Sequence, residues 1–249
     1  CYLRIIITPM QVDLFIPCFI DQLYPSTGFS VVKLLRHAGI QVHYNPEQTC
    51  CGQPAFNSGY QEEARSLALK FLADFSGSAV IVGPSASCVA YIRNYYHRLF
   101  EDDPESMELF NRMKSRIYEL TDFLVNGVRV VDFGARFPHR VTYHDACAAL
   151  REYGIRSEPR ELLSHVEGLE LVEMEDRETC CGFGGTFAAK FTGISTAMTQ
   201  QKVENALAAG AEYIVSTESS CLMNLNSYIQ KNHLPVKTIH IADLLASGL

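Results

Sequence analysis

Eight of the nine cysteines form two series with matching spacing, and this duplication constrains the fold more than any other feature of the sequence. The matched members are Cys18, Cys50, Cys51 and Cys88 in the first half and Cys147, Cys180, Cys181 and Cys221 in the second. Each series contains an adjacent pair followed by glycine, and matched cysteines lie 129 to 133 residues apart. A repeat of this length indicates duplication of a domain-sized unit rather than a solenoid of short repeats.

The two halves also share an order of predicted secondary structure. Short apolar or alternating runs predict strands at Val12–Ile16, Ile40–Tyr44 and Ala79–Gly83, matched by Val141–Tyr143, Leu169–Glu173 and Glu212–Ser216. Helical spacing of apolar residues predicts helices at 31–38 and Gln61–Phe75, matched by 162–166 and Ser195–Ala209. Strands that alternate with helices indicate βαβ units and a parallel sheet. We therefore predict an α/β protein of two pseudo-symmetric halves, each a small parallel sheet flanked by helices.

The domain boundaries follow from the positions of the two repeats. We assign the first repeat to residues 10–127, closed by a helical stretch at Pro104–Asn126, and the second to residues 139–249. The connecting segment, Gly127–His139, contains glycine, proline and several charges. Met10 is a more natural start than Cys1, so we expect Cys1–Pro9 to be an upstream extension.

Composition narrows the functional classes. The net charge is −7, so the chain lacks the basic surface of a nucleic-acid-binding protein. No apolar run approaches the roughly 18 residues that span a bilayer, and no small-residue cleavage site follows the apolar start. We therefore expect a cytoplasmic protein with no membrane span. A disulfide framework is typical of small secreted domains, so metal binding or redox chemistry accounts better for nine cysteines here.

The predicted topology brings the four cysteines of each half to the same edge of their sheet. Each cysteine follows a parallel strand, and open α/β sheets build their sites outside the carboxyl ends of such strands. Four thiolates suit an iron–sulfur cluster or Zn²⁺. Zinc sites usually draw ligands from short Cys-x-x-Cys units, which this sequence lacks, so a cluster is favoured. We expect Gly52 and Gly182 to let the backbone approach that cluster, because glycine has no Cβ.

The sequence around these cysteines resembles a known family. The pattern of one cysteine, about thirty residues, Cys-Cys-Gly, more than thirty residues and a further cysteine is similar to the CCG cysteine-rich domain. That domain occurs twice in iron–sulfur oxidoreductase subunits such as the cysteine-rich subunit of heterodisulfide reductase and the glycolate oxidase iron–sulfur subunit. Two long segments carry the resemblance, Thr49–Tyr60 and Thr179–Phe187. The likeness extends from about Met10 onward and is closest to the lactate-utilization members of the family.

The resemblance implies a function and a set of ligands. It implies an oxidoreductase subunit of a multi-protein complex that oxidises L-lactate to pyruvate, with a ferredoxin-type iron–sulfur protein among its partners. All eight repeat cysteines would bind one or two clusters of the [4Fe–4S] type. The heterodisulfide reductase subunit ends each motif in Cys-x-x-Cys, whereas Tyr91 and Asn224 stand at that last position here. This departure favours four cysteine ligands in each half and an ordinary cluster.

Several alternatives remain open at this point. The chain could serve a glycolate-type or heterodisulfide-reductase-like complex, form a zinc-stabilised scaffold, hold zinc in one half, or act as a metal-free thiol enzyme. His144 precedes Cys147 by three residues, but its repeat counterpart is Phe15, so we interpret it as a structural histidine or a neighbour of the ligands. No flavin or nicotinamide fingerprint is present and the catalytic residues are unknown, so we expect the lone chain to be inactive toward lactate.

Overall fold

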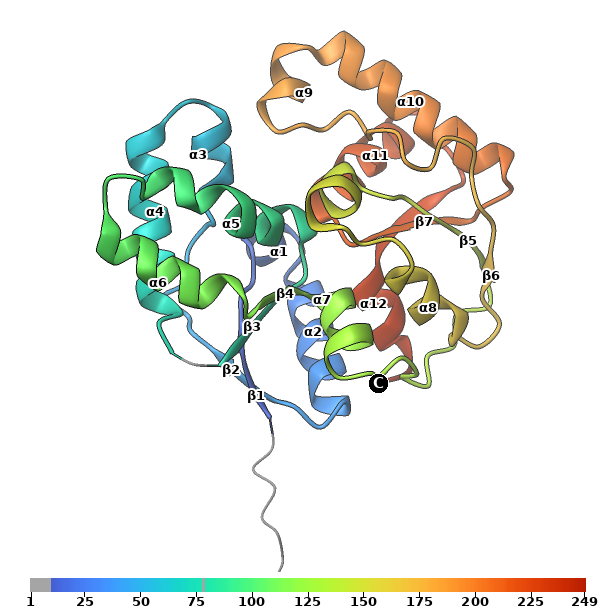
Figure 1. The fold of residues 1–249 in the computed structure, drawn as a ribbon. Helices are drawn as coiled ribbons and strands as arrows, with labels where there is room; N and C mark the ends of the chain where they lie inside the picture. Colours follow the sequence, from blue (N-terminus) through green and yellow to red (C-terminus); the bar gives the residue numbers. More distant parts are fainter. Residues whose placement is uncertain (1–9, 78) are drawn as a thin grey trace, which may run out of the picture.

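The computed structural model describes residues 10–77 and 79–249, so Cys1 and the proposed extension lie outside the described residues. The chain forms two four-stranded sheets, and every pair of neighbouring strands is parallel. The first sheet has the order β2-β1-β3-β4 and the second β6-β5-β7-β8, so the two topologies are the same. The strands are β1 (Gln11–Leu14), β2 (Gln41–Tyr44), β3 (Val80–Gly83), β4 (Ile117–Glu119), β5 (Arg140–Tyr143), β6 (Glu170–Leu171), β7 (Tyr213–Ser216) and β8 (Lys237–His240). The prediction of two similar α/β halves is confirmed (Figure 1).

Helices connect the strands and flank both sheets. The first half contains α1 (Cys18–Leu23), α2 (Pro25–His37), α3 (Gln53–Asn57), α4 (Gln61–Asp74), α5 (Ala86–Leu99), α6 (Pro104–Lys114), α7 (Leu120–Asp122) and a π-helical turn, η1 (Phe123–Gly127). The second half contains the π-helical turn η2 (Ala148–Tyr153), α8 (Glu158–Ser164), α9 (Thr186–Lys190), α10 (Thr192–Ala208), α11 (Ser219–Lys231), α12 (Ile241–Leu245) and a 3₁₀ turn, η3 (Ala246–Gly248). Among the described residues, no helix is long and apolar enough to cross a membrane.

The predicted helical stretch at Pro104–Asn126 is wrong in its middle. Helix α6 ends at Lys114, and Ile117–Glu119 forms β4, which pairs with β3 at the sheet edge. A three-residue strand between two helices gives no alternating pattern that the sequence alone could reveal. Strand β8 occupies the same place in the second sheet and was also missed.

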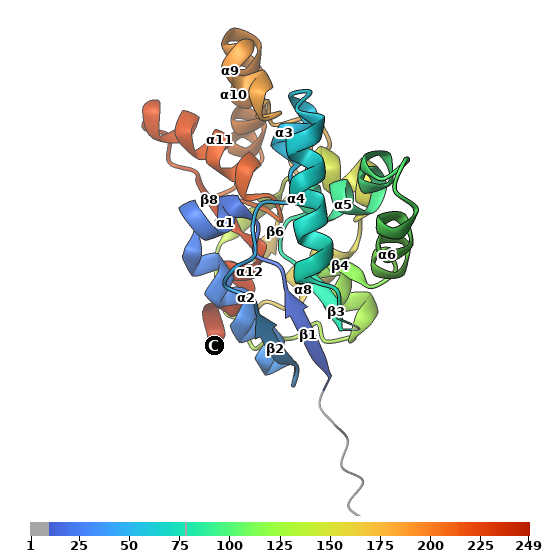
Figure 2. The same ribbon diagram turned by 90° about the vertical axis from the view of Figure 1, so that its left-hand side faces the viewer.

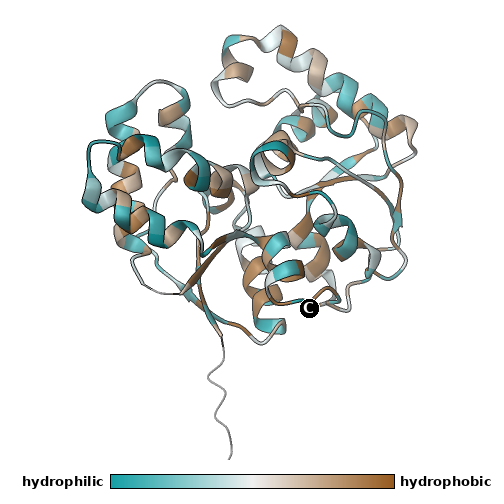
Figure 3. Ribbon diagram, viewed as in Figure 1, coloured by the Kyte–Doolittle hydropathy of each residue, from teal (hydrophilic) through white to brown (hydrophobic). Residues whose placement is uncertain are grey.

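The ends of the two repeats pack against each other's helices. After β8, helix α12 packs on α2 of the first half, and after β4 the α7–η1 segment packs on α8 of the second (Figures 1 and 2). Leu34 and Leu35 of α2 therefore share one buried core with Leu244 and Leu245 of α12. Figure 3 shows apolar residues concentrated on the strands and on the helices between the sheets. Burial of this shared core stabilises the two halves as one body.

Polar contacts at the junction repeat the same exchange. The carboxylate of Glu119, at the end of β4, caps α7 and accepts a hydrogen bond from the Thr217 hydroxyl of the other half. At the equivalent end of β8, His240 caps α12 and lies 3.1 Å from the Pro84 carbonyl oxygen through Nε2. These four residues are matched between the repeats, so each half ties the end of its fourth strand to the loop after the other half's third strand. The carboxyl edges of the two sheets are thus held against each other.

Candidate metal centres

Each predicted cysteine lies just beyond the carboxyl end of a strand. Cys18 begins α1 after β1, and Cys50 and Cys51 lie between β2 and α3. Cys88 lies within the first turn of α5. Cys221 likewise lies in the first turn of α11, and Cys147 is the residue before η2. Because backbone N–H groups point outward at a helix start, this placement favours negative charge on the sulfurs.

The structure brings the four cysteines of the first half together. The Sγ atoms of Cys18 and Cys50 are 3.6 Å apart, well beyond the roughly 2.05 Å of a disulfide bond. Cys51 interacts with the side chains of Cys50 and Cys88, and both interactions raise its pKa. All four are free thiols, and Cys51 is fully buried. We call them the first cysteine set.

The second half repeats this arrangement, and we call its four members the second cysteine set. The side chain of Cys180 interacts with those of Cys147 and Cys181, and the side chain of Cys181 interacts with that of Cys221. Cys181 and Cys221 are buried. In both sets, the first cysteine of the Cys-Cys-Gly motif therefore lies between two other thiols.

The first cysteine of each Cys-Cys-Gly motif has a lowered pKa. Hydrogen bonds from Cys18, from Cys51 and from the Gly52 N–H lower the pKa of Cys50, and the equivalent contacts lower the pKa of Cys180. The hydrogen bond to Cys50 raises the pKa of Cys18, and burial raises it further. Each set thus holds a stabilised thiolate beside further thiols, and thiolates are the form that binds metals.

The glycines of the two Cys-Cys-Gly motifs let their loops pack closely on a helix, and their approach to a cluster stays a prediction. Gly52 and Gly182 have φ angles of +90° and +89°, which favour glycine. A Cβ at Gly52 would lie 3.3 Å from the Ala64 carbonyl oxygen, and one at Gly182 would lie 2.5 Å from the Ser195 carbonyl oxygen. The missing Cβ therefore lets the loop approach α4 or α10. The glycine N–H donates at 3.4 Å to the sulfur of the first cysteine of its motif, Cys50 or Cys180.

Matched positions around the two cysteine sets differ in their side chains. Phe15 and His144 occupy the same place, since their N–H groups donate to the equivalent carbonyls of β3 and β7. Phe15 packs edge-on against Phe71, with ring centroids 5.0 Å apart. The matched contacts of the two glycines, Ala64 in α4 and Ser195 in α10, give the offset between these helices. The same offset makes Lys202 the repeat counterpart of Phe71. A buried histidine and lysine thus stand in the second half where the first half has two phenyl rings.

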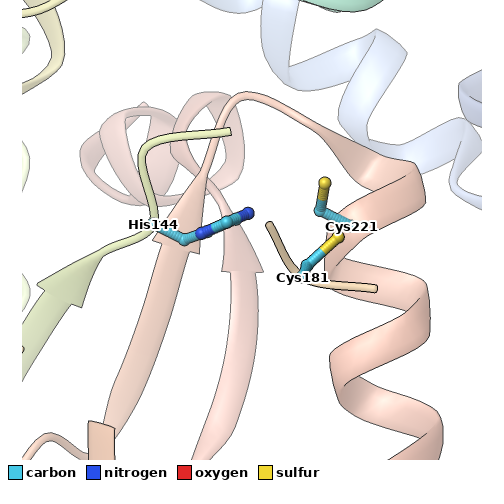
Figure 4. A group of neighbouring side chains, drawn as sticks. All are labelled: His144, Cys181 and Cys221. Atoms are coloured by element: carbon cyan, nitrogen blue, oxygen red, sulfur yellow. The ribbon is translucent and has the colours of Figure 1, made fainter. Parts of the chain in front are cut away.

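His144 faces the second cysteine set. One of its ring nitrogens and the Sγ atoms of Cys181 and Cys221 all lie within 4.8 Å of one another, and the ring points toward the two sulfurs (Figure 4). The Arg177 backbone approaches the ring, but neither ring nitrogen has a hydrogen-bond partner in good geometry. Burial, reinforced by the Lys202 ammonium, lowers the pKa of His144 to about 3, so the imidazole is neutral at pH 7.

Lys202 places a buried positive charge behind the same set. Its ammonium donates to the Asp176 carbonyl oxygen, and its side chain is 1% exposed. Burial lowers the pKa of Lys202 to about 8, while the charges of Cys181 and Asp176 oppose this shift. The group is therefore mostly protonated at pH 7. Sequence reasoning did not identify Lys202, because one lysine in an amphipathic helix is typical of a solvated face.

The first set has an unpaired polar group of its own. The Tyr91 hydroxyl is buried without a hydrogen-bond partner, and Cys51 and Cys50 contribute to the rise of its pKa after burial itself. Tyr91 occupies the last position of the incomplete Cys-x-x-Cys pattern. At the matched position, Asn224 donates to the Cys181 carbonyl oxygen at 3.1 Å. A buried hydroxyl without a partner costs free energy unless a bound group supplies an acceptor.

A buried carboxylate links the helices that carry the two sets. Glu218 precedes Cys221 by three residues and accepts hydrogen bonds from the backbone N–H and hydroxyl of Ser87, at 2.5 and 2.9 Å. Ser87 directly precedes Cys88 of the first set. Burial raises the pKa of Glu218 to about 7. The starts of α5 and α11, and with them the two cysteine sets, are thus joined through one side chain.

These observations fit a bound metal in each half. Sulfur-rich sets with a stabilised thiolate supply soft ligands. The unpaired Tyr91 hydroxyl and His144 nitrogens are polar atoms that a bound group would satisfy. Iron–sulfur clusters and zinc both accept such donors.

Comparisons with known proteins agree with this description. The family model of the CCG cysteine-rich domain matches residues 12–93 and 141–226. Lactate utilization protein A of Exiguobacterium sp. is 43% identical over 241 residues, covering 96% of this chain and 98% of that protein. Lactate utilization protein A 2 of Bacillus cereus is 40% identical over 240 residues, covering 96% and 99%. A hypothetical protein from Helicobacter pylori superposes with a TM-score of 0.61 at 12% identity, covering 97% of this chain and 49% of that one, which shows the fold alone.

Proposed function

The chain belongs to the CCG cysteine-rich domain family, and from this we propose that it is the iron–sulfur electron-transfer subunit of a system that oxidises L-lactate to pyruvate. The observation that carries the proposal is the convergence of four cysteine side chains at the carboxyl edge of each sheet. The substrate is proposed from the relatives, which are named lactate utilization protein A.

Each cysteine set would hold one cluster. The first would be held by Cys18, Cys50, Cys51 and Cys88, and the second would draw its cysteine ligands from Cys147, Cys180, Cys181 and Cys221. A [4Fe–4S] cluster supplies a site that accepts and donates single electrons. The chain's own groups stabilise the negative charge of such a site: the Gly52 and Gly182 N–H groups donate to sulfur, and helix starts lie beside four of the cysteines.

Lactate oxidation requires more than this chain supplies. Oxidation of lactate to pyruvate removes two electrons and two protons, one from the hydroxyl and one from Cα, so it needs a base and a two-electron acceptor. The sequence contains no flavin or nicotinamide fingerprint. We therefore propose that partner subunits, a ferredoxin-type iron–sulfur protein among them, share the chemistry and the relay. They would cover the edge that carries both cysteine sets, beside α3 and α9 (Figure 1).

Metal analysis of anaerobically purified protein tests the cofactor. We expect brown protein with iron and acid-labile sulfide, and a loss of iron from one half in each of Cys50→Ser and Cys180→Ser. Cys1→Ser is the matched control, because Cys1 belongs to neither series. Full iron content in the double variant Cys50→Ser/Cys180→Ser would contradict the proposal.

A zinc site in the second half is the second candidate. It is favoured by the mixed nitrogen and sulfur donors of His144, Cys181 and Cys221, because structural zinc sites commonly combine cysteine with histidine. The same metal analysis separates the two, since zinc that is lost in Cys180→Ser but retained in Cys50→Ser would assign it to the second half.

Reconstitution tests the need for partners. The iron-loaded chain alone should show no lactate-dependent reduction of an artificial electron acceptor, and activity should appear when its partner subunits are added. Turnover by the lone chain would show that a substrate site lies within this sequence.

A further inference from the structure

We propose that His144 is a nitrogen ligand of the metal in the second half, so that this centre is a mixed histidine–cysteine site while the first is sulfur-only. The inference rests on the proposed function, because it requires a metal centre at the second cysteine set. It replaces our interpretation of His144 as a structural or neighbouring histidine.

The first step of the argument is the cost of the observed environment. His144 is 0% exposed, and both ring nitrogens lack a hydrogen-bond partner. A neutral imidazole has one donor and one acceptor nitrogen, and leaving such groups buried and unpaired costs about 1–3 kcal/mol each. Where a histidine only packs in the core, at least one nitrogen is normally satisfied. His240 illustrates this, since it pairs through both nitrogens.

The second step is the direction of the ring. It points at the second set, with one nitrogen and the Cys181 and Cys221 sulfurs mutually within 4.8 Å (Figure 4). Three donors at these separations can surround one metal ion at bond lengths of roughly 2.0–2.3 Å. The Arg177 backbone near the ring could then accept from the nitrogen that faces away from the metal, as the partners of metal-bound histidines commonly do.

The third step is the comparison within the chain. Packing alone would be served by phenylalanine, because Phe15 fills the same place in the first half and contacts Phe71 and Phe75 edge-on. The second half has nitrogen there instead, next to thiols. Among the described residues, the first set has no histidine in a group of this kind. The two halves therefore differ in donor chemistry although their cysteines match.

Pulsed electron paramagnetic resonance tests the assignment directly. Wild-type protein, grown with ¹⁵N-histidine or with unlabelled histidine, is purified anaerobically and reduced, and the nitrogen hyperfine coupling is compared. We expect the strong coupling of a directly bonded nitrogen, with the isotope shift of histidine. In His144→Phe this coupling should be lost while the signal of the first centre is unchanged. Phe15→His is the reciprocal variant and should leave the second centre's coupling intact.

The outcomes separate this inference from the proposed function. Iron assigned to the second half by Cys180→Ser, but without a strong histidine coupling in the wild type, would overturn the histidine ligand and leave the cluster in place. The wild-type isotope comparison decides this even if His144→Phe does not fold. If the second half holds zinc, X-ray absorption at the zinc edge reads the same assignment: a nitrogen bonded to the zinc supports it, and sulfur-only ligation overturns it. If neither metal is present in the second half, the proposed function fails there and the inference fails with it.

Discussion

Three glycines with nearly equal positive φ angles but different surroundings allow the steric requirement of the Cys-Cys-Gly loop to be measured. Gly59, Gly52 and Gly182 have φ angles of +88°, +90° and +89°. A Cβ at Gly59 would meet nothing within 4 Å. At Gly52 it would lie 3.3 Å from helix α4, and at Gly182 it would lie 2.5 Å from the Ser195 carbonyl oxygen of α10. Alanine substitutions therefore share one conformational cost and differ in crowding.

The magnitudes follow from these distances. Placing an alanine in the left-handed region costs about 1–2 kcal/mol, so Gly59→Ala should lower the free energy of unfolding by about that amount. Gly52→Ala needs a shift of a few tenths of an ångström and should cost slightly more. Gly182→Ala must move its loop away from backbone, and overpacking adds about 1–3 kcal/mol, for a total of about 2–5 kcal/mol. It should also displace Cys180 and Cys181 and reduce the metal content of the second half.

Urea denaturation of the three variants and the wild type, prepared anaerobically, gives the comparison. Equal losses in all three variants would refute the argument from crowding. No loss in Gly59→Ala would refute the argument from backbone conformation. Loss of metal in Gly59→Ala would show that the effect does not act through the Cys-Cys-Gly loops.

Three further predictions concern buried polar groups. Lys202→Met should lower the reduction potential of the second centre, because it removes a positive charge beside Cys181; redox titration checks this, with exposed Lys231→Met as the control. Tyr91→Phe should lower the potential of the first centre if its unpaired hydroxyl donates to a cluster sulfur, and an unchanged titration would contradict that role. Burial raises the pKa of Glu218 to about 7 from 4.5, so the stability that its neutral form contributes is full below pH 4.5 and is lost as pH rises through about 7. Glu218→Gln should flatten this part of the Tm–pH profile. Exposed Glu204→Gln is the control, and an equally steep profile in the two variants would be evidence against this role of Glu218.

The sequence predicted what depends on repetition and on strand ends. The duplication, the parallel sheets and the convergence of each cysteine series follow from matched spacing and from the geometry of βαβ units. Helix α4 was predicted at Gln61–Phe75 and ends one residue earlier. These features are encoded locally or by period, so they can be read without knowledge of packing.

What the sequence could not reveal depends on contacts between distant segments. Strands β4 and β8 are short edge strands whose identity comes from pairing with β3 and β7. His144 was interpreted as structural because its repeat partner is Phe15, and Lys202 resembles any polar residue of an amphipathic helix. Their shared position behind the second cysteine set becomes visible only when β5 and α10 are brought together. The signal in the sequence was the loss of repeat symmetry at two positions. The phenyl groups of Phe15 and Phe71 are matched by the nitrogen-bearing side chains of His144 and Lys202.

The exchange of terminal helices explains why such divergence can be tolerated within a duplicated fold. The buried face of α12, with Ile241, Leu244 and Leu245, joins one core that contains α2 of the first half as well as residues of its own half. The loops after the third strands are fixed reciprocally by Glu119 and His240. Both sheets therefore keep their geometry through contacts that do not involve the cysteine sets. Side chains behind each set, such as Phe71 and Lys202, are free to differ, and the two centres can acquire different chemistry on the same scaffold.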